Sequence, residues 1–246
     1  MHQLKVHNAA SNQMVNRKES LWIGVMGCMA FASSGAIGQT FDTAHRSIST
    51  SIQSANAPGG LLIESDGFEL FDHSLSQSFY DDQTGDSGTA QVSLISIIKE
   101  QEWIFNGSFF STASTDALAE ARSEIETVFV ASEGFELFGG IVLNGLELGE
   151  PDGFHILMEV VGENSGVVFE ATRFDLEQVG QSLRLIWSVE LEPDTYTASF
   201  TLRNSSFKDA FNQGSYSVGV YLPSGSTAGI FACAGLVASR RRRVLG

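Results

Sequence analysis

The chain is dominated by short apolar segments that alternate with turn sequences, and this pattern limits the folds open to it. Segments such as 89–98, 124–131 and 183–191 are rich in Val, Ile, Leu, Phe and Thr, and in several of them apolar and polar residues alternate. Glycine, proline and aspartate gather between the segments, as in 149–153 and 162–166. A period of two is typical of strands with one face on a core and one in water. The pattern therefore predicts an all-β protein.

Frequent turn signals between such segments favour about ten short strands arranged as a single antiparallel β-sandwich. We predict a jelly-roll-like sandwich over residues 60–222. Residues 39–59 are small and polar, which favours a flexible lead-in or, alternatively, a first edge strand. Strands are expected at 61–64, 68–71, 89–98, 103–111, 124–131, 135–143, 154–161, 166–174, 183–191, 195–202 and 215–222, and 114–120 fits either one helical turn or a strand edge.

A seven-residue pattern occurs twice in the predicted sandwich. Residues 65–71 read Ser-Asp-Gly-Phe-Glu-Leu-Phe, and residues 132–138 read Ser-Glu-Gly-Phe-Glu-Leu-Phe. Two equivalent hairpins facing a ligand would explain the repeat functionally. One turn-and-strand arrangement used twice in a sandwich explains it structurally, and we favour this interpretation because no third copy follows.

The first 38 residues have the features of a secretory signal peptide. Basic residues at 17–18 precede an apolar segment at 21–32, and small residues follow it. The sequence Ala-Ile-Gly that ends at Gly38 fits a cleavage site, so Gln39 is the predicted new N-terminus. An uncleaved membrane helix and a lipid-modified Cys28 are the alternatives.

Residues 223–246 form a second segment of this kind. Pro223, Ser224 and Gly225 lead into an apolar segment at 228–238. This segment is apolar on all sides and has about a dozen residues, fewer than the roughly 17–25 that span a bilayer comfortably. We predict a short hydrophobic helix in the membrane; a core helix with a solvated basic end is the alternative. Basic residues favour the cytoplasmic side, and four follow the apolar segment: Arg240, Arg241, Arg242 and Arg243.

The formal net charge is −15, and the basic residues are concentrated near the two ends of the chain. The central part is therefore strongly acidic and would repel a phosphate backbone, which excludes nucleic acid as a partner. The two cysteines, Cys28 and Cys233, lie in the terminal apolar segments. The predicted sandwich thus has no disulfide, cysteine ligand or cysteine nucleophile.

No sequence motif supports catalysis. Gly85–Gly88 reads Gly-Asp-Ser-Gly and resembles the nucleophile motif of trypsin-like proteases, with His45 in a sequence like their histidine motif. The separation of His45 from Ser87 is too short to hold the two barrels that such a triad needs. Metalloprotease, nucleophile-elbow and phosphate-loop motifs are missing from the sequence. We predict a protein without catalytic residues or a metal centre.

Two groups of carboxylates are the only hint of a cofactor. Asp81, Asp82 and Asp86 share one predicted loop. Loop oxygens are the ligands that Ca²⁺ prefers, but the spacing matches no known calcium motif, so solvated turns are favoured over a weak Ca²⁺ site. The second group contains Glu147, Glu150 and Asp152.

Trp103 is the candidate glycan contact, because an exposed aromatic ring on a sandwich can pack against the apolar face of a sugar. Trp187 alternates in phase with Leu183, Leu185 and Val189, which predicts that it belongs to the core instead.

The C-terminal tail resembles the PEP-CTERM family of sorting signals, which combine a proline-containing motif, a transmembrane stretch and an arginine cluster. Here Pro223-Ser224-Gly225 stands where the family has Pro-Glu-Pro. The resemblance implies export from a Gram-negative cell, anchoring in the inner membrane and processing by an exosortase-type enzyme. It also implies a place at the cell surface or in the matrix, in association with exopolysaccharide. The body is similar to the β-rich passengers that carry such tails.

Together these features predict an exported, non-enzymatic surface or matrix protein. A carbohydrate-binding module on the same sandwich is the alternative. An enzyme would require two facing carboxylates in a cleft or a buried His–carboxylate–Ser set.

Overall fold

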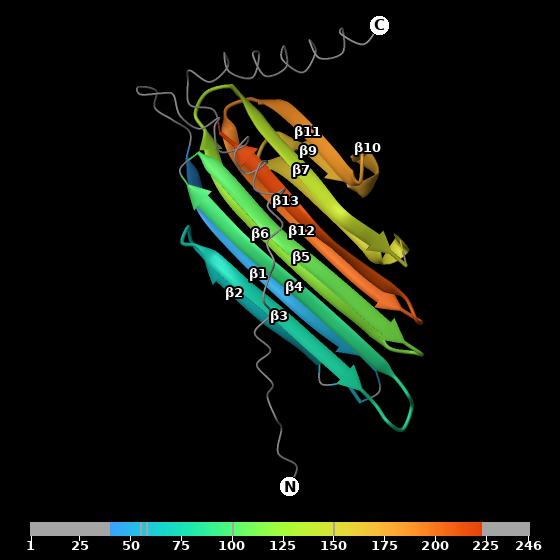
Figure 1. The fold of residues 1–246 in the computed structure, drawn as a ribbon. Helices are drawn as coiled ribbons and strands as arrows, with labels where there is room; N and C mark the ends of the chain where they lie inside the picture. Colours follow the sequence, from blue (N-terminus) through green and yellow to red (C-terminus); the bar gives the residue numbers. More distant parts are fainter. Residues whose placement is uncertain (1–39, 55, 58, 100, 150, 223–246) are drawn as a thin grey trace, which may run out of the picture. The chain divides into compact units, whose positions relative to one another are not determined.

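The computed structural model describes residues 40–54, 56–57, 59–99, 101–149 and 151–222, and Figure 1 shows their arrangement. Strands account for most of this part of the chain, and two short 3-10 turns, η2 (Pro151–Gly153) and η3 (Arg173–Asp175), interrupt them. The strands are β1 (Phe41–Gln53), β2 (Gly59–Asp66), β3 (Phe71–Tyr80), β4 (Ser87–Lys99), β5 (Glu102–Ser114), β6 (Leu118–Ala131), β7 (Phe135–Leu148), β8 (Phe154–Gly162), β9 (Gly166–Thr172), β10 (Glu177–Val179), β11 (Ser182–Leu191), β12 (Asp194–Phe207) and β13 (Phe211–Tyr221).

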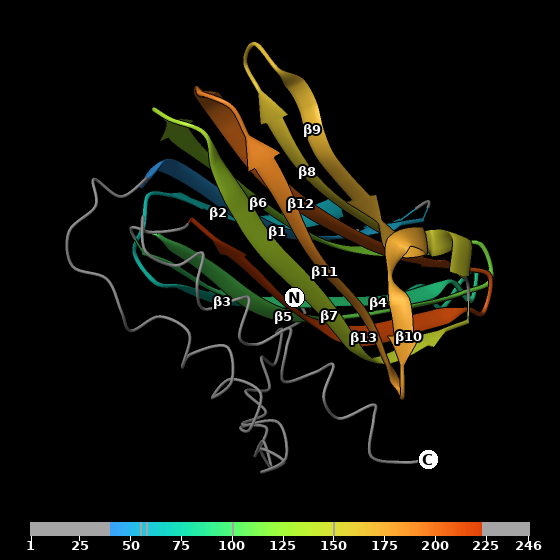
Figure 2. The same ribbon diagram turned by 90° about the horizontal axis from the view of Figure 1, so that it is seen from above.

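The strands form two antiparallel sheets that face one another. One sheet has six strands in the order β2-β1-β6-β12-β8-β9, and the other has seven in the order β10-β11-β7-β13-β5-β4-β3. Figure 2 shows the two layers from above, and the seven-stranded sheet lies in front in Figure 1. The prediction of an all-β, antiparallel sandwich is confirmed.

The predicted flexible lead-in at 39–59 is wrong for most of its length, because it contains β1. This strand lies between β2 and β6, so it is an interior strand rather than an edge strand. Its inward positions include Ile48 and Ile52, which are buried. Arg46 and Thr50 also point inward and are buried. Because these two inward positions are polar, the sequence of β1 does not show a regular alternation of apolar and polar residues.

The predicted strand at 68–71 is also displaced. Residues 67–70 connect β2 to β3, and β3 continues from Phe71 to Tyr80. Within β3 the inward positions Leu75 and Gln77 alternate with serines that face outward. A strand whose outer face is built from serine has a low apolar content, which is why composition alone does not reveal it.

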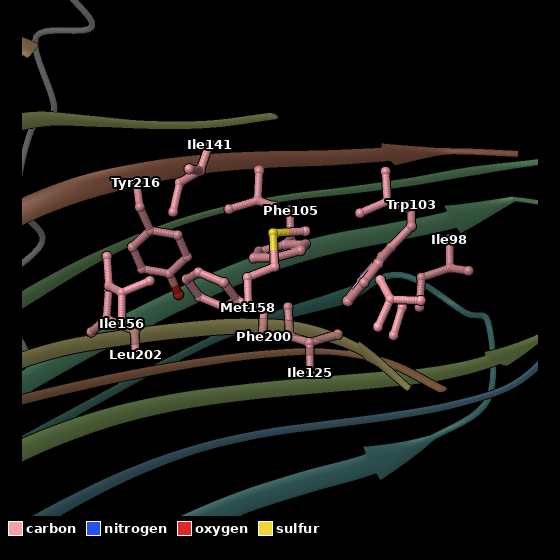
Figure 3. Packing of buried hydrophobic residues seen from close by; sticks show 14 of the residues in the cluster. Ile98, Trp103, Phe105, Ile125, Ile141, Ile156, Met158, Phe200, Leu202 and Tyr216 are labelled. Atoms are coloured by element: carbon pink, nitrogen blue, oxygen red, sulfur yellow. The ribbon is translucent and has the colours of Figure 1, made fainter. Parts of the chain in front are cut away.

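Aromatic rings fill the space between the sheets. Phe41 contacts both Trp103 and Phe129, with ring centroids 6.4 and 5.9 Å apart, and Phe105 lies 4.9 Å from Phe200 of the opposite sheet. Figure 3 shows Trp103 and Phe105 pointing into this layer with Met158 and Phe200. Such rings bury large apolar areas, and burial of this kind is the main favourable term in folding.

Tyr196 fixes the start of β12. Its ring is buried against Phe129, and its hydroxyl donates to the carbonyl oxygen of Glu192 at 2.9 Å. A tyrosine that bonds back to the backbone a few residues upstream is a corner motif of Greek-key sandwiches. Pro193 lies inside this corner. The turn at 192–194 is therefore held in place by the buried Tyr196 as well as by its own sequence.

Both copies of the seven-residue repeat connect the two sheets. The first copy leads from β2 of the six-stranded sheet to β3 of the seven-stranded sheet, and the second leads from β6 to β7 in the same direction. The structural interpretation is thus supported, because the same sequence pattern forms the same type of connection between the sheets in both places. Segment 114–120 spans the end of β5, a turn at 115–116 and the start of β6.

Candidate functional site

Trp103 is not a surface residue, so the prediction that it contacts a glycan is wrong. Its side chain is fully buried, and its ring centroid lies 5.0 Å from that of Phe105. Glu102 and Ile104, on either side of it, face outward, so the period of the strand turns Trp103 into the core. Trp187 is buried as predicted, and its ring stacks on Phe169 of the other sheet with centroids 4.1 Å apart.

The protease-like residues lie apart. His45 pairs in register with Asp66 and Glu126, and its Nδ1 lies 2.8 Å from Asp66 Oδ1. Gly88, at the end of the Gly-Asp-Ser-Gly turn, packs against Ile52 instead. Ile52 lies seven positions after His45 in β1, which is about 23 Å along a strand. Ser87 bonds to Ser114 at 2.6 Å.

The loop that contains Asp81 and Asp86, predicted as a solvated turn with a weak Ca²⁺ site as the alternative, is held by hydrogen bonds within the protein. Asp81 accepts from the Asn56 side chain at 2.7 Å and from the Gln83 backbone at 2.8 Å. These bonds hold the pKa of the Asp81 carboxyl below its usual value. Asp86 accepts from Ser54 at 3.0 Å. Within the described residues, no group of three His, Cys, Asp or Glu side chains could hold a metal ion.

In the second carboxylate group, Glu147 accepts from Gln213 at 2.7 Å, and Asp152 lies 3.7 Å from the guanidinium of Arg173. Glu150 lies outside the described residues.

A shallow pocket of about 330 Å³ opens beside His45. Asp42, Asp66 and Glu126 line it together with Phe68, so three carboxylates border a surface that is mostly apolar. Asp66 is highly exposed, and solvent screening weakens its contact with His45. Among the described residues, the pocket holds no buried nucleophile and no group of three side chains that could hold a metal ion.

The outer face of the six-stranded sheet is charged. Arg203 pairs with Glu120 at 2.6 Å, and Arg122 pairs with Glu124. Arg122 and Arg203 are cross-strand neighbours, and His155 follows them in register. An acidic row crosses the whole sheet and comprises Asp66, His45, Glu126, Ser199, Glu159 and Glu170.

The outer face of the seven-stranded sheet is different, because its central part carries mainly hydroxyl and amide groups. We call this area the hydroxyl panel. One of its rows crosses six strands and comprises Ser74, Ser93, Ser108, Ser215, Asn144 and Ser182. The remaining members are Ser76, Gln91, Phe110 and Gln213 in a second row and Ser78, Thr89 and Thr112 in a third. Glu147 borders the second row beside Gln213, and the exposed Phe211 borders the third beside Thr112.

Cross-strand hydrogen bonds order the hydroxyl panel. Ser93 and Ser108 are 2.7 Å apart, Ser78 and Thr89 are 3.1 Å apart, and Ser182 donates to Asn144 at 2.6 Å. A hydroxyl has one donor and two acceptor positions, so each of these groups keeps capacity for a further partner. The panel is therefore a surface of ordered groups that can each form a further hydrogen bond.

Sequence reasoning missed the hydroxyl panel, although a signal was present. Serine, threonine or glutamine occupies alternate positions at 74–78, at 89–93 and at 213–217. This is the period of a strand whose outer face is hydroxyl-rich. The sequence does not reveal that these three segments belong to one sheet.

The predicted signal cleavage at Gly38 and Gln39 lies outside the described residues, and so do the predicted sorting residues of the tail. In the part of the chain that the structure covers, no helix is both long enough and apolar enough to cross a membrane.

Comparison with protein-family models gives no match, and neither does comparison with curated proteins. Among solved structures, the chain is similar to that of the infectious bursal disease virus Gx strain, at 9% identity and a TM-score of 0.25. A VP2 subviral particle of the same virus gives 8% identity and a TM-score of 0.24. The matches cover 77% and 78% of this chain but only 59% of each viral chain.

Proposed function

We propose that this chain is an exported, non-enzymatic protein of a Gram-negative cell surface or extracellular matrix. The observation that carries the proposal is the pair of terminal segments: a signal-like segment precedes the sandwich, and an apolar segment followed by Arg240–Arg243 comes after it. Signals of the first kind direct export, and the second resembles the PEP-CTERM sorting tail. The inner membrane would anchor the chain transiently before an exosortase-type enzyme processes it.

The finer architecture belongs to the same proposal. We infer a jelly-roll-like connectivity, flanked by an N-terminal signal helix and a short C-terminal hydrophobic helix. Its support is that β12 lies between β6 and β8, and β13 between β5 and β7, so late strands insert between earlier ones. Interleaving of this kind is characteristic of Greek-key sandwiches.

Cell fractionation combined with intact mass spectrometry tests this proposal. The expected result is a chain in the envelope or medium whose mass corresponds to an N-terminus at Gln39 and to loss of Arg240–Arg243. A variant with glutamine at these four positions should keep the full tail. A native mature chain that retains the four arginines would contradict processing, and a cytoplasmic chain would contradict export.

A carbohydrate-binding module on the same sandwich is the second candidate, and the hydroxyl panel favours it. Ordered hydroxyl and amide groups beside one aromatic ring are the groups that hold a polyol. An array of neutral and acidic polysaccharides provides the direct test. Silence across the whole array would count against sugar binding and would leave the surface-protein proposal intact.

A further inference from the structure

We propose that the hydroxyl panel binds an extended, uncharged polysaccharide that lies across the strands. This inference rests on the second candidate above and adds the surface and the class of glycan. The members of the panel are uncharged, although the chain has a net charge of −15; the carboxylate of Glu147 borders the second row, where it accepts from Gln213 at 2.7 Å. The six-stranded sheet carries its acidic row on the opposite outer face, so the two outer faces of the sandwich differ in kind.

The spacing of the panel suits a linear polymer. Neighbouring strands lie about 4.8 Å apart, which is comparable to the length of one sugar unit in an extended chain. A polymer that follows the serine row therefore meets a new hydroxyl or amide group at each strand. Because Ser93 and Ser108 are already hydrogen-bonded at 2.7 Å, little side-chain freedom is lost on binding.

Phe110 supplies the apolar contact that the row of serines lacks. It is partly exposed and faces outward, with Gln91 and Gln213 on the neighbouring strands. The C–H face of a sugar ring packs on an aromatic ring, while side-chain amides bind the hydroxyls at its rim. Phe110 thus takes the role predicted for Trp103. Both residues belong to β5, but Phe110 faces outward and Trp103 faces the core.

Charge selects the neutral class of glycan. A polyanion that approaches the panel meets the repulsion of a strongly acidic protein, and the panel has no Lys or Arg to compensate. A neutral polyol meets no such repulsion and matches the donors and acceptors of the panel. The charges thus favour a neutral, extended polysaccharide over an acidic exopolysaccharide.

Affinity electrophoresis of the full-length chain tests the proposal, with hydroxyethyl cellulose as the neutral probe and alginate as the anionic one. We expect retardation by hydroxyethyl cellulose only. Ser108→Lys, which introduces a long charged side chain in the centre of the panel, should weaken binding at least tenfold. Ser199→Lys makes the same change on the outer face of the six-stranded sheet and should leave binding unchanged. Phe110→Leu keeps apolar bulk without the ring and should weaken binding severalfold.

Three outcomes would overturn the proposal: no retardation of the native chain, equal retardation by alginate, or equal effects of the Ser108 and Ser199 variants. Thermal melting of each variant separates loss of binding from loss of fold. Sedimentation velocity supplies a further contrary outcome, in which Ser108→Lys only dissociates a dimer and the panel is a contact between copies of the chain. Cell fractionation tests export alone. The export proposal and the glycan-binding proposal can therefore fail independently of one another.

Discussion

The phenol of Tyr216 donates a hydrogen bond to Ser123 Oγ over 2.8 Å, and this bond joins β13 of one sheet to β6 of the other inside the core. Both groups are buried. Polar groups at such depth must find a partner within the protein, and this pair is one of several polar contacts between the two sheets; Ser111 of β5 and Ser206 of β12 form another, 2.6 Å apart.

Removal of this bond is expected to destabilise the sandwich. Tyr216→Phe keeps the ring but leaves the Ser123 hydroxyl without its partner, so the free energy of unfolding should fall by about 1–2 kcal/mol. Urea titration followed by far-UV circular dichroism measures the change. In a double-mutant cycle with Ser123→Ala, the two effects should be less than additive. Strict additivity would show that the bond contributes nothing.

Alkaline pH should unfold the protein through its buried tyrosines. Burial raises the pKa of Tyr221 from 10.0 to about 12 and that of Tyr216 further still, despite the hydrogen bond to Ser123. Since the folded pKa values lie above the unfolded ones, stability is fully present below pH 10 and falls as the pH rises through and beyond 12. Tyrosinate absorbance and circular dichroism should change together, and Tyr216→Phe should make the decline shallower. Ionisation of all tyrosines before unfolding would contradict this.

Asp194 should control stability at acid pH. Partial desolvation opposes its ionisation, but hydrogen bonds from Asn164 and Ser165 outweigh that effect and hold the pKa of its carboxyl well below 3.8. The Ser165 backbone and hydroxyl donate at 2.9 and 2.8 Å. A depressed pKa gives stability that is present above pH 3.8 and lost as the pH falls through the folded value.

Asp194→Ala should therefore lower the melting temperature at pH 7 and flatten its decline between pH 4 and 2, measured by differential scanning calorimetry. The control is Glu133→Ala, which removes an exposed carboxylate from a turn. Equal behaviour of the two variants would mean that the bonds of Asp194 do not stabilise the turn between β8 and β9.

Gly139 should not tolerate a side chain. A Cβ at this position would lie 2.1 Å from Cζ2 of Trp187, so the buried indole would have to move. Gly139→Ala should cost about 1–3 kcal/mol, as overpacking of a core does, and should change the tryptophan near-UV signal. Gly140→Ala is the matched control, because that position faces outward and its nearest atom is the Leu185 carbonyl oxygen at 3.3 Å. A tryptophan spectrum unchanged by Gly139→Ala would contradict the packing described.

The class of fold could be predicted from the sequence because most strands keep a visible period of two. β1 and β3 were harder, since each places polar residues at inward positions: Arg46 and Thr50 in one, Gln77 in the other. Arg46 donates to the backbone carbonyl of Glu69 and lies over the Phe71 ring, so tertiary contacts compensate for a residue that strand patterns discourage. Contacts between residues so distant in sequence leave no local signal.

The candidate surface was predictable only in its parts. Phe109 and Phe110 are adjacent, so one of them must face outward, but composition cannot say which. The register of β5 between β4 and β13 decides that Phe110 lies outside, beside Gln91 and Gln213. The choice of Trp103 failed for the same reason, because the phase of β5 is set by its neighbours and not by the residue type.

The position of β13 also has a mechanical consequence. This strand ends at Tyr221 and is hydrogen-bonded along its length to β5 on one side and β7 on the other. A load applied to the chain beyond Leu222, in line with the strand, pulls on both ladders in shear, so many hydrogen bonds resist together. An edge strand loaded across its length would open one bond at a time. If the chain is anchored through its C-terminal tail, as proposed above, the last strand of the sandwich is loaded in the direction in which it resists force best.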